Sequence, residues 1–148
     1  YPENTQLFQY LGLSYMWSGN MKAAIERFNS ALELDNHNPR THLYNGLANA
    51  SFKNGAEKEK QFKEAESEYK MILASNENDI KTLYELSYLY GVWGDSTKIN
   101  EAKNLLAKTY ELIDDDDSDF AKQKELWMKF YFIRFLRNIF WIWRTWNI

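Results

Sequence analysis

Apolar residues recur along the first forty positions at the spacing of amphipathic helices. A first stripe stands at i, i+3, i+4 and i+7 and consists of Phe8, Leu11, Gly12 and Tyr15. A second stripe follows Gly19 and consists of Ala24, Phe28, Ala31 and Leu32. It stops at residues 35–39, a run of Asp, Asn, His and Pro that breaks helices. The pattern predicts two helices joined by a tight turn.

This pattern occurs three times. Each first helix carries a large residue beside a small one, which lets the second helix approach closely; the pairs are Leu11-Gly12, Leu47-Ala48 and Leu86-Ser87. A glycine is expected to end each first helix in a left-handed turn, at Gly19, Gly55 and Gly94. An alanine of each second helix marks the predicted helix crossing, at Ala24, Ala65 and Ala102. Two further packing positions follow each alanine; they are Phe28 and Ala31, Tyr69 and Ile72, and Leu106 and Thr109.

The arrangement resembles the tetratricopeptide repeat (TPR), a helix-turn-helix unit of about 34 residues. The resemblance covers about residues 5–113 and predicts a domain at 1–113 with three repeats at about 5–40, 41–79 and 80–113. It implies an all-α fold, a right-handed solenoid of three TPR-like hairpins, followed by a C-terminal helix.

The departures from the repeat concern its loops and the start of the chain. Asn36 replaces the proline of the family pattern, residues 56–61 form an insertion, and a shorter insertion lies near residues 95–97. Good helix formers fill residues 56–61, so we expect them to lengthen a helix. Pro2 fits either the tail of an earlier repeat or an ordinary proline ahead of a helix N-cap.

The chain changes character after residue 113. Residues 114–119 hold five aspartates and one serine, and the mutual repulsion of these carboxylates predicts a solvated connector. A calcium loop is disfavoured, because the run contains no glycine and Leu126 stands at the twelfth position from Asp115.

Residues 120–148 predict a C-terminal helix that is rich in aromatic residues. Its apolar face gathers Phe132, Phe135, Ile139, Trp143 and Trp146. Arg134 and Arg137 argue against a membrane span. Three uses of residues 127–148 stay open: a cap on the third repeat, a helix in a membrane interface, and a contact with a partner subunit or with a second copy. A capping helix alone does not account for so many aromatic residues, so an interaction is favoured.

Composition and motifs narrow the function classes. The net charge is −3 and the repeats show no basic patch, so no nucleic-acid partner is expected. The chain has no cysteine, which removes thiolate metal sites and a cysteine nucleophile. His37 and His42 have no nucleophile or acidic partner at a recognisable spacing. We therefore predict no enzyme activity, no metal, no cofactor and no small-molecule substrate.

The resemblance places a peptide-binding groove on the first helix of each repeat. Carried over by position, the groove residues are Gln9, Leu13, Met16 and Trp17 in repeat one, His42, Asn45, Asn49, Phe52 and Lys53 in repeat two, and Lys81, Tyr84, Tyr88 and Val92 in repeat three. Aromatic and amide side chains are typical of peptide-binding surfaces. The alternative is that the aromatic residues pack between neighbouring helices.

A groove that binds the C-terminal carboxylate of a chaperone is disfavoured by the residues at the matching positions. Repeats of this family that hold the C-terminal carboxylate of chaperones use Lys and Asn in the first helix, Asn in the second, and Lys with Arg in the third. The matching positions hold Gln9, Leu13, Gly46, Lys81 and Glu85. Only Lys81 fits, and Glu85 places a negative charge where a carboxylate would dock.

Two hypotheses for function follow. The first is a protein-protein interaction scaffold, an adaptor that binds a peptide or helix of a partner in the concave groove. The second is a structural or assembly subunit of a larger, membrane-associated complex that docks through the C-terminal aromatic helix. A soluble intracellular protein is favoured, with peripheral membrane contact as the alternative.

Overall fold

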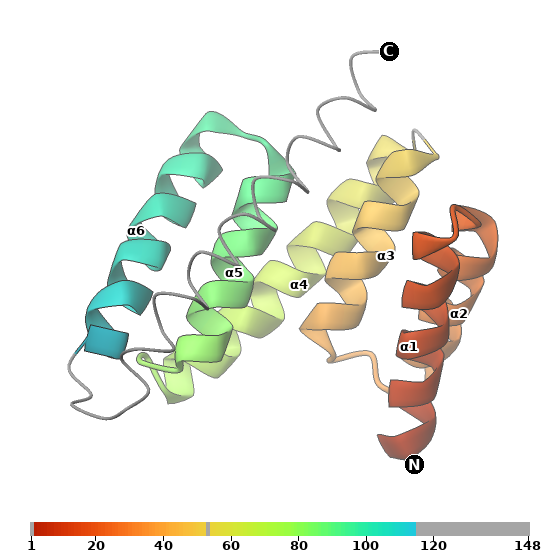
Figure 1. The fold of residues 1–148 in the computed structure, drawn as a ribbon, viewed down its shortest axis with the longest axis horizontal. Helices are drawn as coiled ribbons and strands as arrows, with labels where there is room; N and C mark the ends of the chain where they lie inside the picture. The colour runs from red at the N-terminus through yellow and green to blue at the C-terminus, as the bar shows by residue number, and fades with distance from the viewer. Residues whose placement is uncertain (1, 53, 115–148) are drawn as a thin grey trace. The chain divides into compact units, whose positions relative to one another are not determined.

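The computed structural model of the chain describes residues 2–52 and 54–114. Within these ranges the regular structure consists of six helices (Figure 1). They are α1 Pro2–Trp17, α2 Met21–Leu34, α3 Pro39–Ser51, α4 Gly55–Ser75, α5 Ile80–Trp93 and α6 Ser96–Asp114. The predicted all-α fold is confirmed for the described residues.

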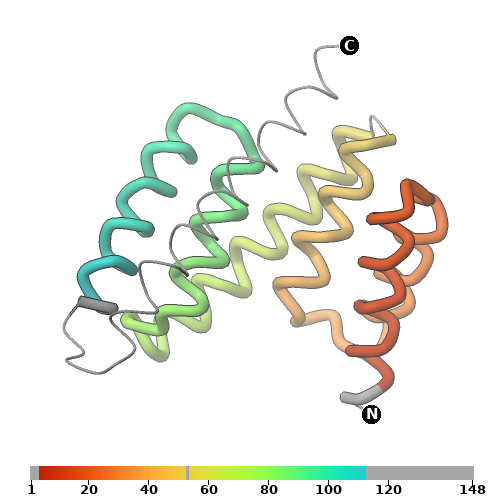
Figure 2. Tube along the Cα trace, viewed as in Figure 1, coloured from red at the N-terminus to blue at the C-terminus, as the bar shows by residue number. Residues whose placement is uncertain are grey.

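The chain divides into two compact units, residues 1–71 and 72–148. The first unit holds α1, α2, α3 and most of α4, and the second holds α5 and α6. In the first unit α1 packs against α2 and α2 against α3, and in the second α5 packs against α6. Figure 2 traces the short turns that join α1 to α2 and α5 to α6. The helices therefore pair in chain order, as the TPR-like pattern predicts.

The closest approach in the first hairpin lies between Gly12 of α1 and the ring of Phe28 of α2. A Cβ added at Gly12 would lie 2.5 Å from Cε1 of Phe28, far inside van der Waals contact. The ring itself is completely buried, as are Ala24 and Ala31 of the same helix. The small residue beside Leu11 therefore acts as predicted, because it lets an aromatic ring press against the helix backbone.

The second hairpin makes the same contact through a residue that the sequence pattern did not single out. A Cβ added at Gly46 of α3 would lie 2.5 Å from Cδ1 and Cε1 of Phe62 in α4. Ala48, the small residue expected at this position, is fully buried but forms a cluster with Leu13 and Phe28 of the first hairpin. The close approach of α3 and α4 is thus made by Gly46, two residues before the predicted position.

The three alanines assigned to helix crossings are all buried. The exposed fractions are 0% for Ala24, 0% for Ala65 and 2% for Ala102, which confirms that prediction. Tyr69 and Thr109 are also buried, whereas Ile72 is exposed. Ile72 was expected to pack, so the repeat pattern is wrong about its burial.

The second unit has its own apolar core. Leu83, Leu86, Leu89 and Tyr90 of α5 are buried together with Ala102 of α6. Lys98 of α6 lies over the rings of Tyr90 and Trp93, with its Nζ atom 4.4 and 5.0 Å from the two ring centroids. This cation–π contact adds an electrostatic attraction to the apolar packing of α5 against α6.

Two of the three predicted glycine turns are present. Gly19 and Gly94 have φ angles of 82° and 83°, a left-handed conformation that costs little only at glycine. The prediction for Gly55 is wrong, because Gly55 is the first residue of α4. Phe52 instead caps the C-terminus of α3, and its backbone N–H donates to the carbonyl of Asn49.

The helix starts differ from the predicted repeat bounds by a few residues. α3 begins at Pro39, ahead of the expected boundary at residue 41, because Asn38 caps it: Asn38 Oδ1 accepts from the backbone N–H of Thr41. Residues 56–61 belong to the 21-residue helix α4, which confirms that the insertion lengthens a helix. Near residues 95–97 the chain forms no extra loop, since α6 already begins at Ser96.

Several predictions lie outside the described residues. They concern Lys53, residues 115–119 of the acidic connector, and the aromatic helix at 120–148. Of the acidic run only Asp114 is described, and it ends α6. No helix among the described residues is long and apolar enough to cross a bilayer.

Candidate interaction surface

The structure separates the predicted groove residues by exposure. Trp17, Phe52 and Lys81 are exposed, and Met16, Tyr84 and Tyr88 are partly buried. The buried ones are Gln9, Leu13, His42, Asn45, Asn49 and Val92. A buried side chain offers a partner little surface, so the exposed members are the stronger candidates for contact within each unit.

The buried amides of α3 form a ladder of hydrogen bonds within the first unit. Asn45 Nδ2 donates to Asn29 Oδ1 of α2 at 2.9 Å. Asn49 Nδ2 donates to the side-chain oxygen of Asn45 at 2.9 Å and to its carbonyl at 3.0 Å. Asn54 Nδ2 in turn reaches Asn49 Oδ1 at 3.5 Å. Asn45 and Asn49 were predicted to face a partner, but the hydrogen bonds of this ladder join α2, α3 and the turn before α4.

Two further predicted groove residues are held in the same way. Gln9 Nε2 of α1 donates to Thr41 Oγ1 of α3 at 3.1 Å. His42 lies against Gln61 of α4 and the carbonyl of Asn36, at 2.6 and 2.8 Å. Buried polar groups need such partners, because an unsatisfied donor or acceptor costs about 1–3 kcal/mol. In the first unit the polar part of the predicted groove therefore holds helices together.

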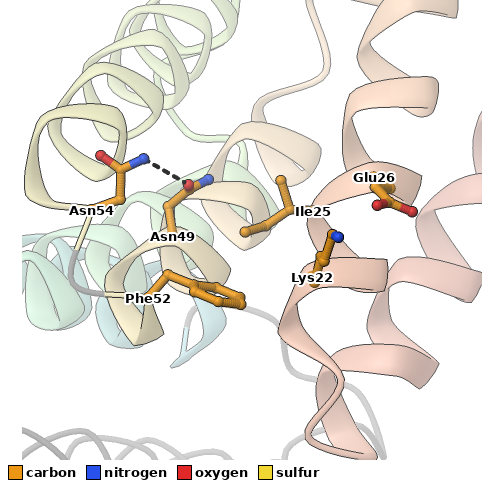
Figure 3. A pocket seen from close by; sticks show the side chains of 6 residues that line it. All are labelled: Lys22, Ile25, Glu26, Asn49, Phe52 and Asn54. Atoms are coloured by element: carbon orange, nitrogen blue, oxygen red, sulfur yellow. Dashed lines mark hydrogen bonds between the residues drawn. The ribbon is translucent and has the colours of Figure 1, made fainter.

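A cleft opens beside this ladder, between the start of α2 and the end of α3. Its volume is about 460 Å³, and its lining residues are Lys22, Ile25, Glu26, Asn49, Phe52 and Asn54. Figure 3 shows Lys22, Ile25 and Glu26 on α2 opposite the three residues from the end of α3 and the following turn. Ile25 and Phe52 give the cleft its apolar surface, and the exposed fraction of Phe52 is 56%.

The cleft is an open surface depression with an apolar centre and a polar border. Its apolar surface is bordered by one cation, one anion and two amides, so it has no strong net charge. The Asn49 side chain on this wall is held by two hydrogen bonds to Asn45. Such a site can take an apolar side chain and leave the polar groups of its backbone near the rim.

The sequence identified two of the six lining residues, Asn49 and Phe52. It missed Lys22, Ile25 and Glu26, because the resemblance assigns the groove to first helices and these three belong to a second helix. It also missed Asn54, because this residue directly precedes Gly55, where a turn and not a groove position was expected. A usable signal was present, since Lys22 and Glu26 stand four residues apart and flank Ile25 on one helix face.

The predicted residues of the second unit lie on α5. Lys81 is exposed in the first turn of that helix, and Val92 is buried near its end. Tyr84 and Tyr88 stand four residues apart and are both partly buried. One helix face can therefore carry both tyrosines, as the groove prediction requires within this repeat.

The acidic and histidine side chains of the described residues were considered as metal ligands and as ion-pair partners. In the ranges 2–52 and 54–114, no group of three or more His, Asp or Glu side chains is placed to hold a metal ion. His37, in the turn after α2, forms an ion pair with Glu68 of α4, with Nδ1 and Oε1 2.9 Å apart. The hydrogen bond to Glu68 and the negative charge of Glu68 raise the pKa of His37 above its ordinary value of 6.5.

This ion pair predicts a pH-dependent contribution to stability. Because the pKa of His37 is raised in the folded state, the contribution is complete below the unfolded value of 6.5 and is lost as the pH rises through the folded value. We expect His37→Gln to lower the urea midpoint more at about pH 6 than at about pH 8.5. Salt should reduce the difference, since the His37 side chain is 72% exposed. An equal loss at both pH values would contradict the assignment.

In comparisons with known proteins, no protein-family model and no curated protein matches this chain. Among solved structures it is similar to one described as the first TPR of Spaghetti (RPAP3) bound to the HSP90 peptide SRMEEVD. The two are 18% identical, and the match covers 87% of this chain and 94% of that one with a TM-score of 0.47.

Proposed function

We propose that this chain is a protein-interaction scaffold whose first unit binds a segment of a partner protein. Three features support the proposal: helical hairpins in chain order, exposed aromatic residues at the ends of successive first helices, and a cleft beside one of them. Trp17 ends α1 and Phe52 caps α3, so both stand at the same end of their hairpins. Exposed aromatic residues beside a pocket are typical anchors of protein interfaces.

The single observation that carries the proposal is the apolar surface of Phe52 and Ile25 in the cleft. An aromatic or branched aliphatic side chain of a partner would displace water from both residues, at about 25 cal/mol for each Å² of apolar surface removed from water. The cleft volume of about 460 Å³ is within the range of ordinary ligand pockets. Lys22 and Glu26 at its border can pair with charged groups on either side of that anchor.

The partner segment is best described as a short peptide or an exposed turn of a helix with one large apolar anchor. The lining of the cleft comes from two short stretches of chain, one with Lys22, Ile25 and Glu26 and the other with Asn49, Phe52 and Asn54. It therefore accommodates one anchor, and further affinity has to come from exposed side chains outside the cleft.

A peptide selection tests this proposal. A library of random peptides displayed on phage is selected on the full chain, and the peptides recovered are measured by fluorescence anisotropy. We expect the sequences recovered to share one large apolar residue. Phe52→Ala should raise the Kd of such a peptide about tenfold or more, as expected for an interface anchor.

Tyr10→Ala is the matched control. Tyr10 is an aromatic residue of α1 that is 65% exposed and does not line the cleft. It should change the Kd by less than about twofold, since rim or distant contacts contribute little. Peptides that bind Phe52→Ala as tightly as the unaltered chain would exclude the cleft as the site.

The second hypothesis, docking through the aromatic helix at residues 120–148, concerns residues outside the described part of the chain. It remains a prediction from the apolar face of Phe132, Phe135, Ile139, Trp143 and Trp146. The absence of catalytic function likewise remains a prediction from the sequence.

A further inference from the structure

The first helix of the chain, α1, exposes more large apolar side chains than it buries. Among the described residues of α1, one large apolar side chain is buried, Leu13, and five are exposed. The exposed five, called the α1 outer face below, are Leu7, Tyr10, Leu11, Tyr15 and Trp17. Two of the residues that α1 does bury, Thr5 and Gln9, are polar. A helix on the surface of a protein normally shows the opposite distribution.

The register of the repeats can be read from the two closest helix contacts. Gly12 lies against the ring of Phe28 in the first hairpin, and Gly46 lies against the ring of Phe62 in the second. The two glycines stand 34 residues apart, and so do the two phenylalanines. Positions of α1 and α3 that are 34 residues apart therefore correspond.

By this register the α1 outer face matches the side of α3 that packs on the first hairpin. In order, Leu7, Leu11 and Tyr15 correspond to Thr41, Asn45 and Asn49. All three α3 residues are buried, and Thr41 and Asn45 are hydrogen-bonded to Gln9 of α1 and Asn29 of α2. In α1 the corresponding side chains are apolar but exposed. This side of a first helix is thus one that packs against other helices.

We propose that the α1 outer face pairs with the same face of a second copy of this chain, antiparallel and about a two-fold axis. Charge favours a copy over a different protein, because residues 4–21 contain no Asp, Glu, Lys, Arg or His in a chain with 26% charged residues. A face without charges cannot select a different partner by opposite charge, and two copies of it meet without like-charge repulsion.

The size of the face suits a small dimer interface. The exposed fractions of its five side chains leave roughly 500 Å² of mostly apolar surface on each copy, since a whole aromatic side chain offers about 150–250 Å². Two copies paired through it would bury roughly 1,000 Å², about the minimum for a specific interface. We therefore expect a reversible dimer.

The order of side chains along α1 is self-complementary in the antiparallel direction. The centre of the face lies between Tyr10 and Leu11, so Leu7 of one copy lies opposite Ser14 of the other, and Tyr10 lies opposite Leu11. Ser14 is exposed and small, which gives the leucine room. A parallel pair would instead set leucine against leucine and hydroxyl against hydroxyl.

This pairing is independent of the proposed binding of a partner segment. No residue of the α1 outer face lines the cleft, so the dimer leaves the cleft accessible. It is also distinct from the self-association predicted for residues 127–148.

Analytical ultracentrifugation of the full chain over a range of concentrations tests the proposal. We expect a monomer–dimer equilibrium. Leu7→Lys should raise the Kd of the dimer about tenfold or more, because it places a cation in an apolar contact. Leu34→Lys is the matched control, since Leu34 at the end of α2 is 51% exposed and Leu7 is 54% exposed. It should change the Kd by less than about twofold.

Three results would overturn the proposal. The first is a chain that stays monomeric up to about 1 mM. The second is a dimer that Leu7→Lys leaves intact, which would place the association on residues 127–148 or on another surface. The third is an equal loss of dimer in both lysine variants.

Disulfide cross-linking tests the direction of the pairing, and it decides by itself if Leu7→Lys does not fold. The chain has no cysteine, so Leu7→Cys and Ser14→Cys each introduce a single thiol. Mixed under mild oxidation, these two variants should form a linked dimer with one chain of each, because the two thiols lie opposite each other. Each variant alone should cross-link much less. A mixture that links no faster than Leu34→Cys with Ser14→Cys would overturn the pairing, as would preferential linkage of either variant to itself.

Discussion

Replacing Phe62 by alanine is expected to lower the free energy of unfolding of the first unit by about 3–5 kcal/mol. The ring is fully buried and lies directly against the backbone of Gly46. Removing it loses the burial of an aromatic side chain and leaves a cavity between α3 and α4 that the glycine backbone cannot fill. The measurement is urea unfolding of the full chain, followed by circular dichroism, with the unfolding midpoint and slope compared between variants.

Phe52→Ala is the control for Phe62→Ala. It makes the same chemical change in the same hairpin, at a side chain that is 56% exposed. The expected loss is within about 0.5 kcal/mol, as is usual for surface positions. If the two variants lowered stability equally, the burial of Phe62 would not be what holds this hairpin together.

Gly46→Ala is expected to destabilise the first unit by about 1–3 kcal/mol, although alanine is the better helix former. In an open helix position the substitution would stabilise by about 1 kcal/mol. At Gly46 the new Cβ would lie 2.5 Å from two carbons of the Phe62 ring, and that ring is fully buried, where side chains are closely packed. The clash with the Phe62 ring therefore outweighs the higher helix propensity of alanine, and the substitution destabilises the protein. Urea unfolding measures the sign of this effect directly.

Two further variants separate the steric cause from other effects of the substitution. Gly55→Ala adds the same methyl group at a helical glycine, where an added Cβ would have no neighbouring atom within 4 Å. This substitution should leave the free energy of unfolding unchanged or raise it slightly. In a Gly46→Ala, Phe62→Leu pair the smaller side chain makes room for the methyl group. The double variant should then lose less stability than the sum of the two single variants. Exact additivity would show that Gly46 and Phe62 do not act through their contact.

The sequence by itself determined the elements of this protein and the order in which they pair. Helical periodicity and breaker residues are local signals, and they placed the hairpins and the left-handed turns at Gly19 and Gly94. The burial of Ala24, Ala65 and Ala102 also followed from the repeat pattern, because a small residue is required wherever two helices cross closely. The helical insertion at residues 56–61 followed from propensity alone.

Only the tertiary structure decided which face of a helix meets which neighbour. The long α4 places Phe62 against Gly46, a contact that the expected repeat register assigns to Ala48. Asn45 and Asn49 have the composition of a binding surface, yet they are buried and hydrogen-bonded to Asn29 of α2 and Asn54 of the turn before α4. A polar side chain has the same sequence signature whether its partner is a ligand or its own chain.

The apolar residues of the cleft show that the sequence also does not predict which apolar side chains stay exposed. Ile25 reads as an ordinary core position of an amphipathic helix, and Phe52 as one end of a first helix. They line one cleft because α2 packs against α3, across a distance in sequence that no local pattern spans. The periodicity of apolar residues predicts which face of a helix is buried. The packing of whole helices decides which apolar surface stays exposed to solvent.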